Sequence, residues 1–329
     1  MCTCIDLKTK DYYFGRNLDL DERFGEKVVI TPRNYKFDLK NGSTIFTKYA
    51  MIGMASVVQN YPLYAEAASE RGLAMAGLYF PQNAYFFEPK DSNLNLAPYE
   101  LIPYFLGQYA TVAEIKNNIK NLNITNIPFV QGLPIADLHW MISDGENCIV
   151  LEQMKDGLKI YDNPVGVLTN NPPFDYHLMN LNNYMNLTPN NKEKGFSNKI
   201  DLQAYGQGMG AIGLPGDVSP ASRFIRAAFY KLNSICKEDE ESSVTQFFHI
   251  LDSVAMVQGA TMTKEGKYDI TTYSCCINLS KGIYYYKTYT NNQITAIKMS
   301  EKEKLKTKLS IYELIENQQI KYANGIKSE

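Results

Sequence analysis

Two β-patterned runs open the chain: Met1-Cys2-Thr3-Cys4-Ile5-Asp6-Leu7 and, after a short polar break, Phe14-Gly15-Arg16-Asn17-Leu18-Asp19. Apolar residues alternate in part along the first run, which is typical of a strand. Arg16 and Asp19 are charged residues inside this β-rich segment. If the two strands are neighbours, the guanidinium of Arg16 lies near Cys2, and its positive charge favours the thiolate form of that residue.

Cys2 is the most informative position, because the initiator Met is expected to be removed when so small a residue follows it. The mature chain then begins with a thiol and a free α-amine on one residue, which brings a nucleophile and its general base together without a histidine. In that arrangement Asp19 would hold the α-ammonium group or steer its proton. Two plainer readings stay open: an early Cys that merely follows the start, and a surface pair of Arg16 and Asp19 worth about 0–1 kcal/mol.

The composition is that of an ordinary globular chain of 329 residues, enough for one large domain or two. Lys and Arg number 33 and Asp and Glu 35, so the basic excess that indicates nucleic-acid binding is missing. No run approaches the roughly 20 apolar residues that cross a bilayer, so no membrane association is expected. Asp6 and Lys8 stand where a signal peptide is apolar, and we expect a cytoplasmic protein. The cysteines and histidines lack zinc-binding spacing, so no metal is expected.

The order of expected elements indicates a layered α+β fold. The periodicity predicts helices over 61–71 (ended by Gly72), 98–107, 111–122, 222–232 and 244–257. It predicts strands over 28–31, 73–80, 138–143, 148–153, 158–161 and 166–169, and a hairpin of 271–278 with 282–290. Strands and helices therefore come in blocks, which favours a sandwich over a βαβ parallel sheet.

Further runs, in order along the chain, resemble the choloylglycine hydrolase family of N-terminal nucleophile (Ntn) hydrolases. Besides the two opening runs they are Thr31-Pro32-Arg33-Asn34-Tyr35, Asn60-Tyr61-Pro62, Gly72-Leu73-Ala74-Met75-Ala76-Gly77-Leu78, Leu138-His139-Trp140, Gly166-Val167-Leu168-Thr169-Asn170-Asn171-Pro172, Gly213-Leu214-Pro215-Gly216-Asp217 and Pro220-Ala221-Ser222-Arg223-Phe224. Each run is weak alone, but jointly they are specific and cover residues 2 to about 300. The family contains bile salt hydrolases and penicillin V acylases.

The resemblance implies a single Ntn-hydrolase domain over 1–329 whose mature form starts at Cys2. It implies a four-layer αββα sandwich with two central antiparallel sheets, a cytoplasmic location, a homotetramer, and amide hydrolysis with neither metal nor organic cofactor. Carried over residue by residue, the catalytic set is Cys2, Arg16, Asp19, Asn170 and Arg223.

The resemblance also gives these residues roles. The side-chain amide of Asn170 and the backbone N–H of Tyr79 would hold the oxyanion, and removal of one such donor costs about 10²–10³ in rate. Arg223 would complete the charge network around the nucleophile. Without the resemblance, Asn170 reads more simply as a turn residue before Pro172, and Arg223 as a surface charge at the start of a helix.

The family's acyl-pocket positions correspond to five apolar residues that suit the face of a steroid: Leu18, Val58, Ala65, Phe129 and Leu133. Isolated apolar residues are more often core residues than pocket walls. Tyr79 departs from the bile salt hydrolases, which usually have Asn there, and agrees with the penicillin V acylases. The runs over 163–172 and 208–217 nevertheless resemble bile salt hydrolases of Gram-positive gut bacteria more closely.

Hydrolysis of glycine- or taurine-conjugated bile acids is therefore the first hypothesis and penicillin V hydrolysis the second. A non-catalytic bile-acid-binding protein on the same scaffold is a third hypothesis, although such a protein would need no thiol beside an amine. The sequence does not separate hydrolysis from transfer of the acyl group to an amino acid.

Overall fold

Two large antiparallel sheets form the centre of the computed structural model, which describes residues 1–91, 93–191 and 195–325. The six-stranded sheet has the order β14 (Val167–Leu168), β1 (Cys2–Lys8), β2 (Tyr12–Leu20), β15 (Ile270–Asn278), β16 (Ile283–Thr288) and β17 (Asn291–Lys298). The eight-stranded sheet has the order β13 (Gly157–Asp162), β12 (Cys148–Met154), β11 (Leu138–Ser143), β8 (Ala74–Tyr79), β7 (Tyr61–Ser69), β6 (Met51–Val58), β3 (Lys27–Thr31) and β18 (Ser310–Tyr312).

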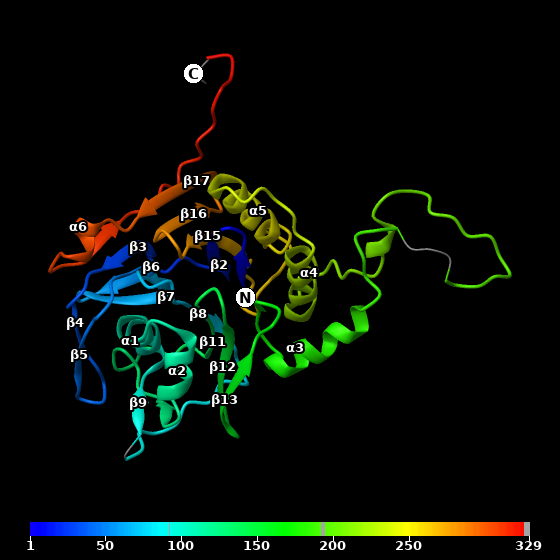
Figure 1. Ribbon diagram of the computed structural model, residues 1–329. Helices are drawn as coiled ribbons and strands as arrows, with labels where there is room; N and C mark the ends of the chain where they lie inside the picture. The colour runs from blue at the N-terminus through cyan, green and yellow to red at the C-terminus, as the bar shows by residue number, and fades with distance from the viewer. Residues whose placement is uncertain (92, 192–194, 326–329) are drawn as a thin grey trace.

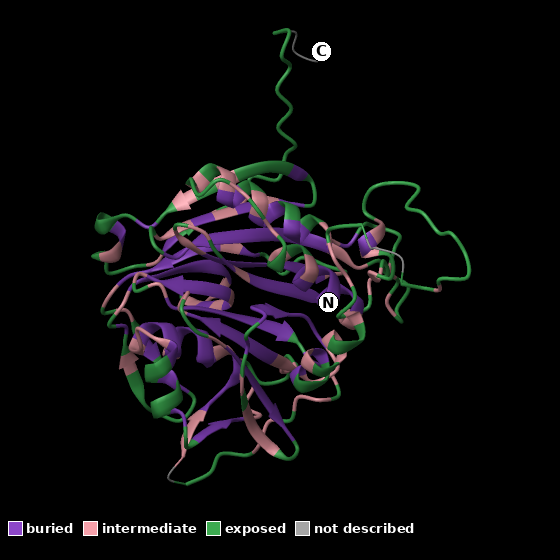
Figure 2. Ribbon diagram, turned by 45° about the vertical axis from the view of Figure 1, so that its right-hand side comes forward, coloured by how far each residue is buried: buried purple, intermediate pink, exposed green. Residues whose placement is uncertain are grey.

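Helices cover the outer faces of both sheets (Figure 1). The helices α1 (Leu101–Gln108) and α2 (Val112–Asn118) pack on the eight-stranded sheet, where Phe105 and Ile115 share a buried cluster with Trp140. On the six-stranded sheet lie α4 (Pro220–Leu232) and α5 (Glu240–Asp252). The central strands between these layers are almost wholly buried (Figure 2), whereas the edge strands β13 and β17 are largely exposed or half-buried. The arrangement is the four-layer αββα sandwich that the resemblance implied.

The remaining elements are short. They are two small pairs of strands, β4 (Lys36–Asp38) with β5 (Thr44–Phe46) and β9 (Leu94–Leu96) with β10 (Leu122–Ile124), and the helices η1 (Pro98–Glu100), α3 (Phe174–Asn180), η2 (Leu181–Tyr184), η3 (Met209–Ala211) and α6 (Glu301–Lys304). Among the described residues, no helix is both long and apolar enough to cross a membrane.

The expected helix over 61–71 is wrong: the segment forms β7, in the middle of the eight-stranded sheet. Its Ala and Glu residues favour helix locally, but pairing with both β6 and β8 outweighs that weak preference. The small side chains serve close packing instead. A Cβ at Gly53 of β6 would lie 2.5 Å from the Cβ of Ala67.

The other expected elements are present with shifted ends. The expected helix 111–122 stops at Asn118 as α2, with Thr111 as its N-cap, and Leu122 starts β10. The expected helix 244–257 covers 240–252 as α5, because Asp239 caps it five residues before the first predicted apolar position. The strands predicted over 73–80, 138–143 and 148–153 are confirmed to within a few residues. The hairpin predicted over 271–278 and 282–290 is confirmed as β15 and β16.

The register of β1 against β2 places the N-terminus beside the charges of β2. Cys2 lies opposite Leu18, and Cys4 lies opposite Arg16. The backbone N–H of Asp19 donates to the Met1 carbonyl at 2.8 Å, and the Met1 ammonium donates to the Asp19 carbonyl at 2.6 Å. The N-terminus is therefore held as part of the sheet.

Candidate active site

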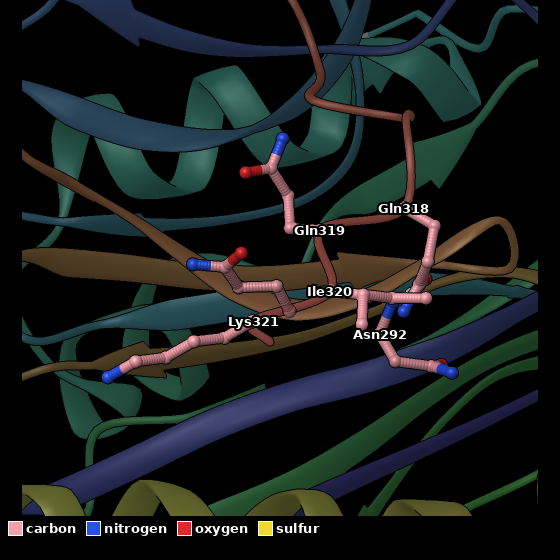
Figure 3. A pocket seen from close by; sticks show the side chains of 6 residues that line it. Asn292, Gln318, Gln319, Ile320 and Lys321 are labelled. Carbon is pink, nitrogen blue, oxygen red and sulfur yellow. Dashed lines mark hydrogen bonds between the residues drawn. The ribbon is translucent and has the colours of Figure 1, made fainter. Parts of the chain in front are cut away.

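A cavity of about 740 Å³ opens at one end of the two sheets, and Cys2 lies in its wall. Apolar side chains from both sheets and from α1 line most of it: Leu18, Leu20, Phe24, Leu63, Ala65, Ile102, Leu138 and Trp140. Charged residues also line it: Asp21, Lys264, Glu265 and Asp269. A hollow of about 470 Å³ between β17 and the C-terminal segment (Figure 3) is lined by side-chain amides, Ile320 and Lys321. None of the residues that line this hollow is a Cys, Ser or Thr, so the cavity with Cys2 is the candidate site.

Cys2 is tied to two distant segments. Its side chain is 3% exposed, and its backbone N–H donates to Oδ1 of Asn170 at 2.8 Å. Its carbonyl oxygen accepts from a guanidinium nitrogen of Arg223. Residues 2, 170 and 223 thus meet at the start of β1.

The side-chain amide of Asn170, just after β14, is fully oriented. Its Oδ1 accepts from Cys2 and from Arg223 at 2.7 Å, so its Nδ2 must face the other way. That nitrogen donates to the carbonyl of Tyr79 at 2.7 Å. A second N–H remains on Nδ2, because a primary amide has two.

Tyr79 contributes its backbone at the end of β8. The N–H of Phe80 donates to Asp137, so residue 80 belongs to a hydrogen-bonded pair, and the N–H and C=O of Tyr79 face away from β11. On that side the pairing of β7 with β8 ends at Ala76. The edge of β8 beyond Ala76 therefore presents backbone groups toward the Cys2 end of the six-stranded sheet.

Arg223 enters from the first turn of α4, which starts at Pro220 after the N-cap Ser219. Besides Cys2 and Asn170, its guanidinium contacts the Thr3 hydroxyl at 2.7 Å and the Val218 carbonyl at 3.0 Å. Burial lowers the pKa of this arginine, although the charges of Asp19 and Cys2 oppose that effect.

Arg16 lies between the two sheets and also lines the cavity. It donates to the carbonyls of Ala65, at 3.3 Å, and Gly77, and its Nε lies 3.8 Å from Oε2 of Glu66. Burial acts to lower its pKa, but the negative charges of Cys2, Tyr273 and Glu66 outweigh it, and the pKa is raised overall.

Asp19 is fully buried and accepts a hydrogen bond from the Thr271 hydroxyl at 2.6 Å. Burial raises its pKa, against the opposing charges of Arg223 and the N-terminal ammonium. Its second carboxylate oxygen has no hydrogen-bond partner among the described residues. An unpartnered, buried carboxylate oxygen near an N-terminus is suited to accept from an ammonium group.

Two histidines that the sequence leaves far apart hold adjacent carbonyls at the site. Nε2 of His139 lies 3.0 Å from the Thr169 carbonyl, and Nε2 of His177 lies 2.9 Å from the Asn170 carbonyl. Burial lowers the pKa of His177 to about 4, so its ring is neutral at pH 7 and donates through Nε2. Sequence reasoning gave neither histidine a role at the site, because their spacing shows no pattern, although His139 stands in one of the runs that resemble the family.

The five predicted acyl-pocket residues are not all brought together. Leu18 and Ala65 line the cavity. Val58, at the end of β6, Phe129 and Leu133 do not. Phe129 packs on Tyr99, with the ring centroids 5.2 Å apart, and so lies behind a residue that does line the cavity. Leu133 is 56% exposed, because its loop turns it toward solvent rather than into the cavity.

Among the described residues, no group of three or more His, Cys, Asp or Glu side chains could hold a metal ion.

The model of the linear amide C–N hydrolases, choloylglycine hydrolase family, matches residues 2–315. The chain belongs to this family. It is therefore a hydrolase of linear amide C–N bonds.

Relatives of this chain match over nearly their whole length. It is 48% identical to a bile salt hydrolase/transferase of Lactiplantibacillus plantarum, over 95% of this chain and 97% of that one. It is 43% identical to a bile salt hydrolase/transferase of Clostridium perfringens, over 98% and 100% of the two chains.

Solved structures agree with the fold. A conjugated bile acid hydrolase from Clostridium perfringens superposes with a TM-score of 0.92 at 42% identity, covering 98% of this chain and 100% of that one. A penicillin V acylase from Agrobacterium tumefaciens has a TM-score of 0.70 at 20% identity, covering 91% and 87%, and shows the shared fold alone.

Proposed function

We propose that this enzyme hydrolyses the amide bond of glycine- or taurine-conjugated bile acids. The observation that carries the proposal is the position of Cys2 in the wall of a cavity of about 740 Å³ with a largely apolar lining. A steroid acyl group buries a large apolar face, and each Å² contributes about 25 cal/mol. The names of the relatives, which share 43–48% identity, support the same substrate class.

The proposed reaction starts when Met1 is removed and the α-amine of Cys2 becomes free. The thiolate of Cys2 attacks the amide carbonyl, and the α-ammonium donates a proton to the departing amine. The unpartnered oxygen of Asp19 would hold that ammonium. Arg16 and Arg223 place positive charge around the nucleophile, and water activated by the α-amine then hydrolyses the thioester.

The oxyanion of the tetrahedral intermediate would be bound by two donors. One is the second N–H of the Asn170 amide, whose first N–H is held by the Tyr79 carbonyl. The other is the backbone N–H of Tyr79, which faces away from β11. Both are oriented before substrate binds, which is what makes such donors effective.

The deciding experiment measures product release by the mature enzyme in parallel assays. We expect free glycine or taurine from conjugated bile salts at a kcat/KM well above that for release of 6-aminopenicillanic acid from penicillin V. The reverse order would make it a penicillin V acylase, the alternative that Tyr79 favours. Binding of conjugated bile salts without turnover would make it a bile-acid-binding protein. An added amino acid tests whether the thioester also transfers its acyl group to an amine.

A second experiment tests the proposed base. A variant with an N-terminal extension that resists Met removal keeps the Cys2 thiol but has no free α-amine on it. We expect such a protein to be inactive. Full activity of the extended form would contradict the assignment of the α-amine.

We further propose that residues 1–329 form one Ntn-hydrolase domain, starting at Cys2 when mature, which works in the cytoplasm as a homotetramer. Large apolar side chains on the segment that projects from the sandwich support self-association (Figure 1): Met185, Phe196 and Tyr205 are 77%, 83% and 88% exposed. Analytical ultracentrifugation tests the homotetramer. A monomer at micromolar concentration would contradict it.

A further inference from the structure

A buried carboxylate, Glu66 of β7, lies directly behind Arg16 and outside the set of residues that the family resemblance supplies. It is fully buried between the two sheets. Both of its oxygens accept from tyrosine hydroxyls of the opposite sheet: Oε1 from Tyr284 at 2.6 Å and Oε2 from Tyr273 at 2.8 Å. Oε2 also lies 3.8 Å from Nε of Arg16. Three donor groups thus surround one carboxylate. Burial raises the pKa of Glu66, while the charge of Arg16 and the two tyrosine hydrogen bonds act to lower it.

Two other contacts of Arg16 are made with residues next to Glu66 in the eight-stranded sheet. One terminal nitrogen, Nη1, donates to the carbonyls of Ala65 and Gly77. Ala65 is the neighbour of Glu66 in β7. Gly77 follows Ala76, which pairs with Glu66 between β7 and β8. The Nε edge faces Glu66. Nε also donates to the carbonyl of Asn17, the next residue of β2, at 3.5 Å. The other partners lie on the eight-stranded sheet, although Arg16 itself belongs to the six-stranded one.

The remaining nitrogen of Arg16, Nη2, differs from Nη1 and Nε in its hydrogen bonding. It is buried and has no hydrogen-bond partner among the described residues. Arg16 shares the cavity wall with Cys2. A buried guanidinium with two sides engaged and one side unpaired is arranged to meet a further negative group, since an unpaired buried N–H of a cation is costly.

We propose that Glu66 is a positioning residue for the reaction: it fixes the Nε edge of Arg16 so that Nη2 is presented to the Cys2 thiolate. Tyr273 and Tyr284 hold Glu66 in turn and anchor it to the opposite sheet. The inference deepens the proposed function and rests on it, because it assumes that the Cys2 thiolate is the nucleophile.

The test is the rate at which iodoacetamide alkylates Cys2 of the mature enzyme, followed by peptide mass spectrometry across pH. Glu66→Gln removes the charge and keeps the size. We expect its alkylation midpoint to move to higher pH by about one unit, and kcat for a conjugated bile salt to fall tenfold or more with KM changed less than threefold. Cys4 and Arg223 also interact electrostatically with Cys2, and both are unchanged in every variant, as is Asp19.

The direction of the shift separates two roles. If Glu66 acted only as a nearby negative charge, its removal would favour the thiolate and move the midpoint to lower pH. A shift to lower pH, or no shift, overturns the proposal. Glu66→Asp keeps the charge on a shorter side chain and should recover part of the midpoint and of kcat. If the Gln variant does not fold, Glu66→Asp tests the proposal alone. An Asp variant with the alkylation midpoint and kcat of the wild type overturns the proposal.

Tyr284→Phe is the matched control. It removes one of the two tyrosine hydrogen bonds that hold Glu66 but leaves the carboxylate and its contact with Tyr273, so we expect a lower Tm and a shift of the alkylation midpoint clearly smaller than in Glu66→Gln. A midpoint that shifts equally in Tyr284→Phe and Glu66→Gln would mean general loosening of the core and overturn a specific role. Alkylation needs no substrate, so failure of the wild type to hydrolyse bile salts would remove the proposed function without affecting this test.

Discussion

The floor and the mouth of the cavity are built in opposite ways. The floor, as we call it, consists of Cys2 and Arg16, which line the cavity, and of Asp19, Asn170 and Arg223 behind them. Each is at most 3% exposed and bonded to other segments of the chain. At the mouth, Phe24 and Tyr79 are 37% and 47% exposed. We infer that the floor sets the chemistry for every substrate, whereas the mouth sets the choice among acyl groups. The predictions below test that division, from the largest expected effect to the smallest.

Cys2→Ser should remove nearly all catalytic activity of the floor residues. An alcohol is a far poorer nucleophile than a thiolate at the same pH, so we expect kcat to fall by about 10³ or more. Steady-state release of glycine or taurine measures this, with mass spectrometry to confirm that Met1 has been removed. Hydrolysis near the wild-type rate would refute the proposed nucleophile.

Asn170→Ala should cost about 10²–10³ in kcat, because it removes one donor to the oxyanion. Asn170→Asp sharpens the result. It keeps an oxygen for Arg223 but has no N–H for the Tyr79 carbonyl or the oxyanion, so we expect a similar loss. Substantial activity in the Asp variant would show that Asn170 acts through its oxygen alone.

His177→Phe should act on the floor indirectly, through the carbonyl of Asn170. We expect about a tenfold loss in kcat, which corresponds to about 1.4 kcal/mol. The exposed His249, replaced by Gln, is the control and should behave as wild type. An unchanged kcat in His177→Phe would mean that the backbone at 170 needs no support from this ring.

The same histidine predicts a pH dependence of stability. Its pKa in the folded protein is about 4, below its ordinary value of 6.5, so the unfolded chain binds the proton more tightly. The free energy of unfolding should therefore fall as the pH is lowered from about 6.5 to 4, by up to about 3 kcal/mol from this group. Urea denaturation at a series of pH values measures the slope. His177→Phe should flatten it, and an equal slope in both proteins would exclude His177 as its source.

Tyr79→Asn tests the mouth and should have the smallest effect. The backbone N–H survives, so the hydrolytic rate on the better substrate should change only a few-fold. The ratio of bile salt to penicillin V rates should rise by about tenfold, because removal of the ring changes the space for the acyl group. Tyr79→Phe keeps the ring and should keep the wild-type ratio. If the Asn variant also keeps that ratio, Tyr79 does not determine selectivity.

By itself, the sequence gives the family, the two-sheet sandwich and the residues of the floor, because reactive groups at ordered positions form a recognisable pattern. Most strands and helices are also predictable, since their periodicity is local. The expected helix over 61–71 fails for a physical reason. Its Ala and Glu residues have a weak helical preference, and pairing with β6 and β8 overrides it.

Only the tertiary structure decides which scattered residues support the floor. Glu66 looks like an exposed helical charge until β7 places it between the sheets. His139 and His177 hold neighbouring carbonyls although 37 other residues separate them in the sequence. Val58, Phe129 and Leu133 are apolar by sequence, yet they do not line the cavity. The physical reason is that burial and hydrogen-bond partners depend on chain segments distant in sequence, and no local pattern records them.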